Sequence, residues 1–256
     1  MVAFSGGVDS SLLARVAHDE LGDRAVAVTG VSASLAPDER SNAQTVAREI
    51  GIRVIELSTN ELADPRYAQN GPDRCYFCKS ELFDRVLAWA NERGLGPVLD
   101  GLNADDDPAE RPGVRAADER GVRSPLREAG LAKNDVREVA RLLGLSTAEK
   151  PASPCLASRI PHGTPVTAER LVRVARAESS LRGLGLEELR VRYHGELARV
   201  EVPTDRFDVV LSRRLEVMAC VREAGFRHVT LDLGGLRSGG AERPAEPATV
   251  TGRTDR

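Results

Sequence analysis

The stretch that decides the fold is Met1–Ser11, MVAFSGGVDSS, at the start of the chain. Its first four residues are apolar and typical of a short buried strand, and they run directly into the loop SGGVDSS. Apolar residues then recur at helical spacing along Ser11–Leu21. Two glycines permit a tight turn that brings backbone N–H groups to an anion, and the positive end of the next helix points to the same place. The stretch therefore predicts a phosphate-binding loop between a strand and a helix.

Working outward, predicted strands and helices alternate up to Lys150. The expected strands are Met1–Phe4, Ala25–Val31, Val54–Leu57 and Pro97–Leu102. The expected helices are Ser11–Leu21, Pro37–Ile50 (ended by Gly51), Glu81–Arg93, and Ala132–Leu143 with Asn134 or Asp135 as its cap. This alternation predicts an α/β fold with a parallel, Rossmann-like sheet over residues 1–150.

The pattern changes after Lys150. Four prolines in Pro151–Pro165 predict an irregular loop, and the elements after it come in a different order. They are a helix at Thr167–Leu184 with Thr167 as N-cap, strands at Leu189–Tyr193 and Leu197–Val202, a helix at Asp205–Ala224 and a strand at Arg227–Leu233. We expect a smaller α+β domain over residues 151–236. The Gly-, Pro- and Ala-rich composition of residues 237–256 predicts a disordered tail.

Composition narrows the function classes. The chain has 256 residues, 41% of them hydrophobic, and a net charge of −3. Near-zero charge argues against an extended nucleic-acid surface. No apolar run reaches the roughly 18 residues of a membrane span, and the N-terminus does not resemble a secretory signal. The very short first strand also raises the expectation that residues are missing ahead of it. We expect a cytoplasmic protein with no membrane partner.

The loop at Ser5–Ser11 resembles the PP-loop of the ATP pyrophosphatase superfamily. It is not a Walker A loop, because the Gly-Lys-Ser/Thr ending is absent. The resemblance extends to residues 100–106, DGLNADD, although Leu102 replaces the usual Thr. It implies ATP and Mg²⁺ as cofactors, with Asp9 near the metal. The nucleotide-binding residues it implies are Ser5, Gly6, Gly7, Val8, Asp9, Ser10, Ser11, Gly101, Asn103, Asp105 and Lys150.

The chain has only four cysteines and three lysines. Cys75 and Cys78 form a CxxC, a spacing that zinc, redox and iron–sulfur sites all use. The sequence has no second CxxC or His pair, which argues against a closed zinc site, and the context argues against a thioredoxin-like role. Cys155 lies in the proline-rich loop near Arg159, where a nearby cation would favour a nucleophilic thiolate. Cys220 is expected to be a core residue. The three lysines, Lys79, Lys133 and Lys150, stand among 33 arginines (36 basic residues less 3), so each is a candidate for a role that arginine cannot fill.

Four segments make the resemblance specific: RCYFCK at 74–79, residues 100–106, RSPLREAGL at 123–131 with Lys133, and KPASPCLASRIPHG at 150–163. Together they resemble the LarE family of ATP-dependent sacrificial sulfur transferases, over nearly the whole chain. His162 departs from the family pattern, which usually has Tyr there.

The resemblance implies a substrate and a chemistry. The substrate would be pyridinium-3,5-biscarboxylic acid mononucleotide, a carboxylate of which is adenylated by ATP and then attacked by sulfur. In members with one reactive cysteine, the thiol at the Cys155 position attacks and its Cβ–S bond is cleaved. Two such steps make the bis-thiocarboxylate of the nickel-pincer nucleotide cofactor. Other enzymes of that synthesis and a homo-oligomeric state are the implied partners, without nucleic acid.

The three-cysteine pattern implies a second sulfur source. Members with cysteines matching Cys75, Cys78 and Cys155 are thought to bind a [4Fe-4S] cluster that carries an extra sulfide. We favour the cluster over the sacrificial route, and spacing alone does not decide between them.

The implied substrate is anionic, so cations should line its site. Arg159, Arg190 and Arg192 are the candidates for substrate binding, the last two because they alternate on one strand and share a face. Glu178 and Glu201 are candidates for a divalent ion. Two competing functions are kept: a PP-loop enzyme that thiolates tRNA through an iron–sulfur cluster, and a nucleotide-binding regulator without turnover.

Overall fold

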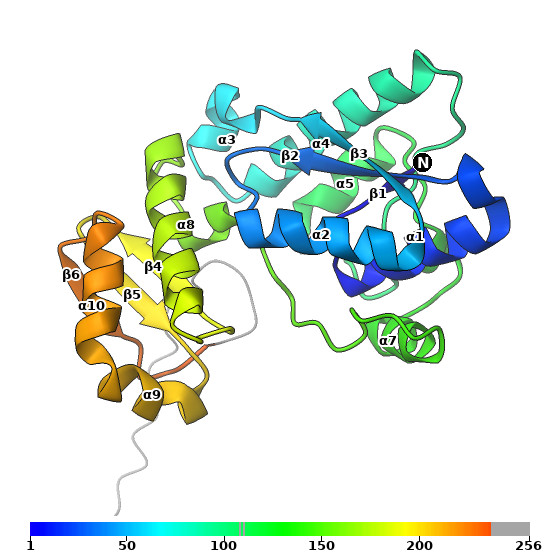
Figure 1. Ribbon diagram of the computed structural model, residues 1–256. Coiled ribbons are helices and arrows are strands. Elements are labelled where there is room, and N and C mark those ends of the chain that lie inside the picture. Colours follow the sequence, from blue (N-terminus) through cyan, green and yellow to red (C-terminus); the bar gives the residue numbers. More distant parts are fainter. Residues whose placement is uncertain (108, 110, 237–256) are drawn as a thin grey trace, which may run out of the picture.

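Two separate three-stranded sheets organise the chain, each with its own helices (Figure 1). The computed structural model describes residues 1–107, 109 and 111–236, so the predicted tail at 237–256 lies outside the described residues. The first sheet is parallel, in the order β1 (Val2–Ala3), β2 (Val26–Val31), β3 (Arg53–Ser58). The second combines an antiparallel and a parallel pair. The α/β class with a parallel first sheet and a second small sheet is confirmed, and the domain boundary at residue 151 stays a prediction.

The predicted fourth strand, Pro97–Leu102, is wrong. Only Leu99 makes strand-like bridges, to Val2 and to Arg123. Because β1 is just two residues long, it offers Leu99 one pairing position and nothing further along. The chain then turns away, and the buried carboxylate of Asp100 accepts a hydrogen bond from Ser124 Oγ at 2.7 Å. The segment ends as a loop at the carboxyl edge of the sheet.

Helices cover both faces of the first sheet. The long ones are α1 (Val8–Leu21), α2 (Pro37–Ile50), α4 (Arg74–Asn91) and α7 (Lys133–Leu142). Apolar residues of α1, α2 and α7 form one buried cluster, while Phe83 and Val86 of α4 pack with Val26 and Val28 in another. The α2 prediction is confirmed, and Gly51 ends that helix with φ 86°. Helix α4 begins seven residues before the predicted start, so the cysteine pair is helical.

Short helices and turns connect these elements. They are η1 (Gly22–Arg24), η2 (Glu61–Ala63), α3 (Pro65–Ala68), α5 (Pro112–Asp118), α6 (Pro125–Glu128) and η3 (Leu156–Arg159). The N-cap of α7 is Ala132 rather than Asn134 or Asp135, and Asp135 accepts the Ala132 N–H at 2.9 Å instead. The first turn of α7 therefore satisfies both the N–H of Ala132, through Asp135, and the Ala132 carbonyl, through the Val136 N–H.

The second sheet packs against a long helix. Helix α8 (Ala168–Gly183) starts at the predicted cap, where Thr167 Oγ1 accepts the Arg170 N–H at 3.3 Å. Strands β4 (Arg190–His194), β5 (Leu197–Glu201) and β6 (His228–Leu231) match their predictions closely. The predicted helix at 205–224 is divided at Arg213 into η4 (Thr204–Arg206), α9 (Phe207–Ser212) and α10 (Arg214–Glu223).

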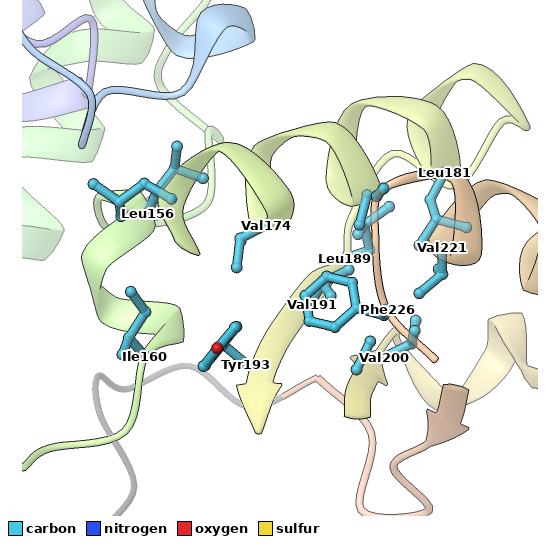
Figure 2. Close-up of a cluster of buried hydrophobic side chains, with 14 of the residues drawn as sticks. Leu156, Ile160, Val174, Leu181, Leu189, Val191, Tyr193, Val200, Val221 and Phe226 are labelled. Carbon is cyan, nitrogen blue, oxygen red and sulfur yellow. The ribbon is translucent and has the colours of Figure 1, made fainter. Parts of the chain in front are cut away.

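The proline-rich loop is part of the second core. Leu156 and Ile160 are 2% and 0% exposed and lie with Val174 and Tyr193 in one cluster (Figure 2). Burying such a side chain contributes about 1.5–3 kcal/mol. Tyr67 of α3 belongs to the same cluster, although it precedes the loop by almost ninety positions in the chain. The apolar residues of the loop that carries Cys155 therefore pack into a core supplied by distant elements. No helix in the described ranges has the length and apolar character to cross a bilayer.

Candidate functional site

The predicted phosphate loop lies between β1 and α1. Gly6 has φ +69°, and a Cβ there would lie 2.8 Å from the Cα of Ala43 on α2. Only glycine fits both the conformation and the space. Gly7 is the N-cap of α1 and has no side chain to cap it, so the first N–H groups of the helix point outward without a side-chain acceptor. Free N–H groups and a helix N-terminus together suit a phosphate.

Serine hydroxyls hold the loop in shape. Ser10 Oγ donates to the Gly7 carbonyl at 3.1 Å and accepts the Ser5 N–H at 3.3 Å. The hydroxyl of Ser5 lies 3.2 Å from Ser10 Oγ, and Ser5 is exposed. Ser11 is fully buried, and its hydroxyl has no hydrogen-bond partner. Ser10 thus acts on the loop backbone, while Ser5 is presented to a ligand.

Asp9 joins two further segments to the loop. Its carboxylate accepts hydrogen bonds from Asn103 Nδ2 at 2.9 Å and from Lys133 Nζ at 2.5 Å. The backbone N–H of Lys133 is in turn bound by Asp105 at 2.8 Å. A Cβ at Gly101 would lie 2.9 Å from the backbone nitrogen of Ser10, so the two backbones are in direct contact. The predicted residues 101, 103 and 105 are thus brought to Asp9.

Lys133 is a site residue that the predicted set did not include. It contacts the predicted magnesium-binding carboxylate directly and is 38% exposed, so it can reach a ligand. Its scarcity in an arginine-rich chain was the available signal. Lys150, which was predicted, lies with Nζ 3.2 Å from the Gly6 carbonyl and 2.7 Å from Glu39 of α2. Both lysines therefore stand at the phosphate loop, Lys133 on the Asp9 carboxylate and Lys150 on the Gly6 carbonyl.

Asp100 is a buried carboxyl beneath this loop. Burial raises its pKa, and the hydrogen bonds from Ser124 and the Leu102 N–H oppose that rise. The side chain is 5% exposed. It holds the Gly101–Asp105 segment in place without facing the ligand.

The three candidate cysteines lie at the junction of the two halves. Cys75 and Cys78 are in the first turns of α4, and Cys155 directly precedes η3. Cys75 and Cys155 are exposed, whereas Cys78 packs against the second hydrophobic core. Burial raises the pKa of the Cys78 thiol, with further contributions from Cys155, Glu61 and Cys75. All three sulfurs thus share one neighbourhood. Cys220, predicted as core, is partly buried against the same cluster.

That the three cysteines lie near one another does not by itself make them metal ligands. Within the described part of the chain, no three His, Cys, Asp or Glu side chains stand close enough together to hold a metal ion. The donor chemistry of three thiols suits an iron–sulfur cluster, but their arrangement as it stands does not form its binding site. The cluster stays a prediction.

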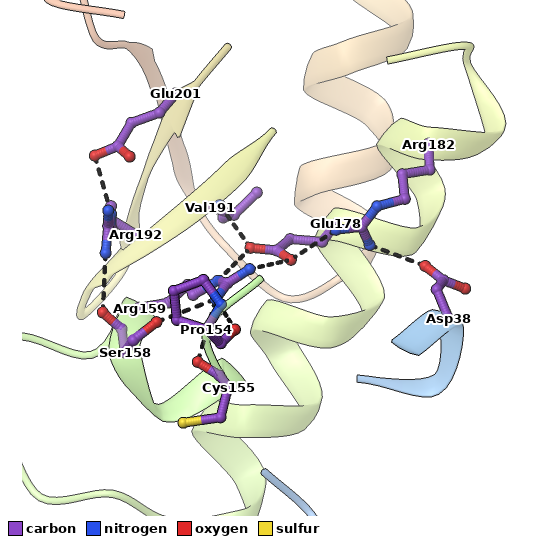
Figure 3. A network of polar contacts seen from close by, with 10 residues as sticks. All are labelled: Asp38, Pro154, Cys155, Ser158, Arg159, Glu178, Arg182, Val191, Arg192 and Glu201. Carbon is purple, nitrogen blue, oxygen red and sulfur yellow. Dashed lines mark hydrogen bonds and ion pairs between the residues drawn. The ribbon is translucent and has the colours of Figure 1, made fainter. Parts of the chain in front are cut away.

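Arg159 holds the backbone around Cys155. It is 3% exposed, and its Nη1 donates to the carbonyls of Pro154 and Cys155 (Figure 3). Its other nitrogens bind Glu178, which is fully buried, at 2.9 and 3.2 Å. The Cys155 side chain points away from this network. Arg159 therefore positions the loop and leaves the sulfur accessible.

Glu178 is saturated by donors. Besides Arg159, it accepts the Val191 N–H at 3.0 Å and Arg182 Nη2 at 3.1 Å. Arg182 also binds Asp38 of α2 at 2.9 Å, which ties α8 to the half that contains the parallel sheet (Figure 3). A carboxylate with four such contacts has little capacity left for the divalent ion that the sequence suggested.

Arg190 and Arg192 are buried rather than solvated. Each is 6% exposed, and Arg192 binds Glu201 at 2.9 Å and the Ser158 carbonyl at 2.9 Å. Burial lowers the pKa of Arg190, and so does the charge of Arg192 and Arg159. Three cations thus converge on the side of the Cys155 loop that faces β4. Their role in substrate binding stays a prediction.

The cysteine loop and the phosphate loop lie at the same edge of the parallel sheet. The Leu156 N–H donates to the carbonyl of Ser34 at 2.9 Å, and Ser34 follows the carboxyl end of β2. The phosphate loop follows the carboxyl end of β1. Ligands of open α/β sheets bind at this edge. The arrangement can therefore present a bound nucleotide to a nucleophilic thiol.

Comparisons with known proteins agree with this geometry. Residues 1–70 match the asparagine synthase family model. A pyridinium-3,5-bisthiocarboxylic acid mononucleotide synthase of Lactiplantibacillus plantarum is 41% identical over 93% of this chain and 87% of its own. An uncharacterized protein of Synechocystis sp. is 48% identical over 95% and 91%. A tRNA-specific 2-thiouridylase of Rickettsia africae is 27% identical over 60% of this chain and 52% of its own.

Proposed function

This chain belongs to the LarE family of ATP-dependent sulfur transferases, and we propose that its substrate is pyridinium-3,5-biscarboxylic acid mononucleotide. The family relative that makes the bisthiocarboxylic acid nucleotide covers almost the whole chain. The observation that supports the proposal is the phosphate loop and the exposed Cys155 at one sheet edge. The product would be the corresponding thiocarboxylate.

The first step activates a carboxylate. A carboxylate oxygen of the substrate attacks the α-phosphorus of ATP, and the bond to the β-phosphate oxygen breaks to release pyrophosphate. The free N–H groups at Gly7 and the hydroxyl of Ser5 would bind the departing phosphates. Lys133 and Lys150 supply positive charge beside them, and Asp9 would hold the magnesium ion. Activation is needed because a free carboxylate has no leaving group.

The second step transfers sulfur. In the sacrificial route, which needs no group beyond this chain and ATP, the Cys155 thiolate attacks the acyl carbon, AMP leaves, and a thioester joins enzyme and substrate. Loss of the Cys155 α-proton and cleavage of its Cβ–S bond then release the thiocarboxylate and leave dehydroalanine in the chain. Arg159, ion-paired to Glu178, would hold the loop backbone so that the Cys155 sulfur reaches the acyl carbon, and all three buried arginines, Arg159, Arg190 and Arg192, would add positive charge near the anionic substrate.

The sulfur source has a direct test. A [4Fe-4S] cluster on Cys75, Cys78 and Cys155 would place iron and sulfide in anaerobically purified protein, in a ratio near one to one. The sacrificial route instead predicts a Cys155 peptide lighter by hydrogen sulfide after turnover. Mass spectrometry together with iron and sulfide analysis separates the two, and Cys155 is required in both.

The substrate is tested by pyrophosphate release. Purified protein with ATP and Mg²⁺ should release pyrophosphate when the dicarboxylate mononucleotide is added, and not when tRNA is added. Release with tRNA alone would overturn the proposal in favour of tRNA thiolation, and release with neither would favour a regulator.

The reaction would take place in the cytoplasm, in a homo-oligomer, ahead of the enzymes that load nickel into the cofactor.

A further inference from the structure

Asn70 has an unusual backbone in the middle of the site. Among residues 1–107, 109 and 111–236, it is the one non-glycine residue with a positive φ, at 59°. It is also completely buried. The left-handed conformation costs an L-residue about 1–2 kcal/mol, although asparagine tolerates it better than most. Such a residue persists only where its surroundings hold it, and such positions cluster at functional sites.

The Asn70 side chain holds the end of the Cys155 loop. Its Nδ2 lies 3.2, 2.8 and 2.8 Å from the carbonyls of Ile160, Pro161 and Thr164. Its own carbonyl accepts the Gly163 N–H at 3.1 Å and lies 3.2 Å from Nδ1 of His162. One buried residue thus gathers five consecutive loop positions, 160–164, around itself.

Arg74 extends the same contact to the cysteine pair. It is 5% exposed, and its Nη1 donates to Asn70 Oδ1 at 2.6 Å and to the Ala157 carbonyl at 2.9 Å. It is the first residue of α4 and directly precedes Cys75. Ala157 is two positions beyond Cys155. A single guanidinium therefore connects the helix start that carries Cys75 and Cys78 to the loop that carries Cys155.

We propose that Asn70 and Arg74 form a clamp that positions Cys155 against Cys75 and Cys78 for sulfur transfer. This inference rests on the proposed function, because the clamp serves the sulfur-transfer step. The side-chain hydrogen bonds of both residues go to each other and to the Cys155 loop, so we expect the clamp to affect sulfur transfer rather than adenylation. The two ends of the Asn70 amide bind the two cysteine segments, with Nδ2 on the Cys155 loop and Oδ1 on Arg74 at the start of α4.

The matched variants are Asn70→Gly and Asn70→Ala. Glycine keeps the left-handed backbone and removes every side-chain bond, whereas alanine removes the bonds and also strains the backbone. Asn91→Gly, at the exposed end of α4, makes the same change away from the loop and is the control. Arg74→Lys keeps the charge but removes the guanidinium whose Nη1 makes both bonds, and this variant carries the test should either Asn70 variant fail to fold.

The first measurement needs no substrate. Alkylation of each cysteine by iodoacetamide is followed by peptide mass spectrometry on the full chain, with iron content recorded. Cys78 is covered by the core that the clamped loop completes, so Asn70→Gly should speed its alkylation severalfold. Cys220 packs against the same core from α10, which receives none of the clamp's side-chain hydrogen bonds, and should keep the wild-type rate. If the alkylation rates of Cys78 and Cys220 rose in parallel, or if the rate at Cys78 did not rise, the clamp would be overturned.

The second measurement uses turnover. In Asn70→Gly, the first-turnover burst of pyrophosphate should stay within about twofold of the wild type, while thiocarboxylate formation falls about 10- to 100-fold, the cost expected of an ångström-scale misplacement. An equal loss in pyrophosphate release and thiocarboxylate formation, or no loss in thiocarboxylate formation, would overturn the clamp. A wild type that releases no pyrophosphate refutes the proposed function instead, and the alkylation rates still decide the clamp.

Discussion

The phosphate loop and the Cys155 loop reach the same edge of the sheet by different means. The phosphate loop is built from consecutive residues, with Gly6 supplying the turn and Ser10 the internal hydrogen bonds. The Cys155 loop has almost no regular structure of its own and is held from outside. Its anchors come from distant parts of the chain, namely Ser34, Asn70, Arg74, Glu178 and Arg192. Substitutions within the phosphate loop should therefore disrupt it, whereas the Cys155 loop should be disrupted by substitutions in distant segments.

The largest effect should come from the sulfur itself. Cys155→Ala removes the nucleophile but leaves the phosphate loop intact, so thiocarboxylate formation should fall to background while the pyrophosphate burst persists. Coupled assays of both products measure this. Cys220→Ala, a cysteine change in the α10 helix, should leave both rates close to the wild type. Full sulfur transfer by Cys155→Ala would mean that another group carries the sulfur.

The next effect tests whether the Cys155 loop is held from outside. Glu178→Ala leaves the buried guanidinium of Arg159 without its partner, which should lower the free energy of unfolding by about 3–5 kcal/mol. Denaturant titration measures this. Glu216→Ala breaks an exposed pair with Arg213 in the same half and should have a much smaller effect. Equal losses in the two variants would show that the buried network does not hold the loop.

The phosphate loop should respond to a change within it. Gly6→Ala forces a left-handed alanine, at about 1–2 kcal/mol, and drives its Cβ against Ala43. ATP affinity, measured by calorimetry, should fall at least about tenfold because the loop must shift. Gly144→Ala has nearly the same φ, +68°, but open space around its Cβ. It should be destabilised by the strain alone and bind ATP as the wild type does; a loss of affinity there would contradict the steric argument.

This difference also explains what could be predicted from the sequence. The phosphate loop, the α2 boundaries and the Thr167 cap depend on neighbouring residues, and the structure places them where the pattern indicated. The strand at Pro97–Leu102 failed because its pairing depends on the length of β1, more than ninety positions away. The contact of Lys133 with Asp9 and the clamp at Asn70 are likewise long-range. No local pattern marks a residue whose partners are set by the fold.

The smallest effect concerns the buried carboxyl of Asp100, which binds Ser124 and the Leu102 N–H. Burial raises its pKa above the ordinary value of 3.8, so the unfolded chain loses this proton at a lower pH than the folded chain does. The wild type therefore loses stability as the pH rises through that interval. Asp100→Asn does not titrate, and its amide oxygen can still accept the bonds from Ser124 and Leu102. From about pH 4 to pH 7, the free energy of unfolding of the variant should rise relative to that of the wild type. This gain should be smaller than the stability that Gly6→Ala loses. Unfolding free energies at the two pH values measure this, and a variant that loses ground as the pH rises would show that the ionised carboxylate is the form the fold prefers.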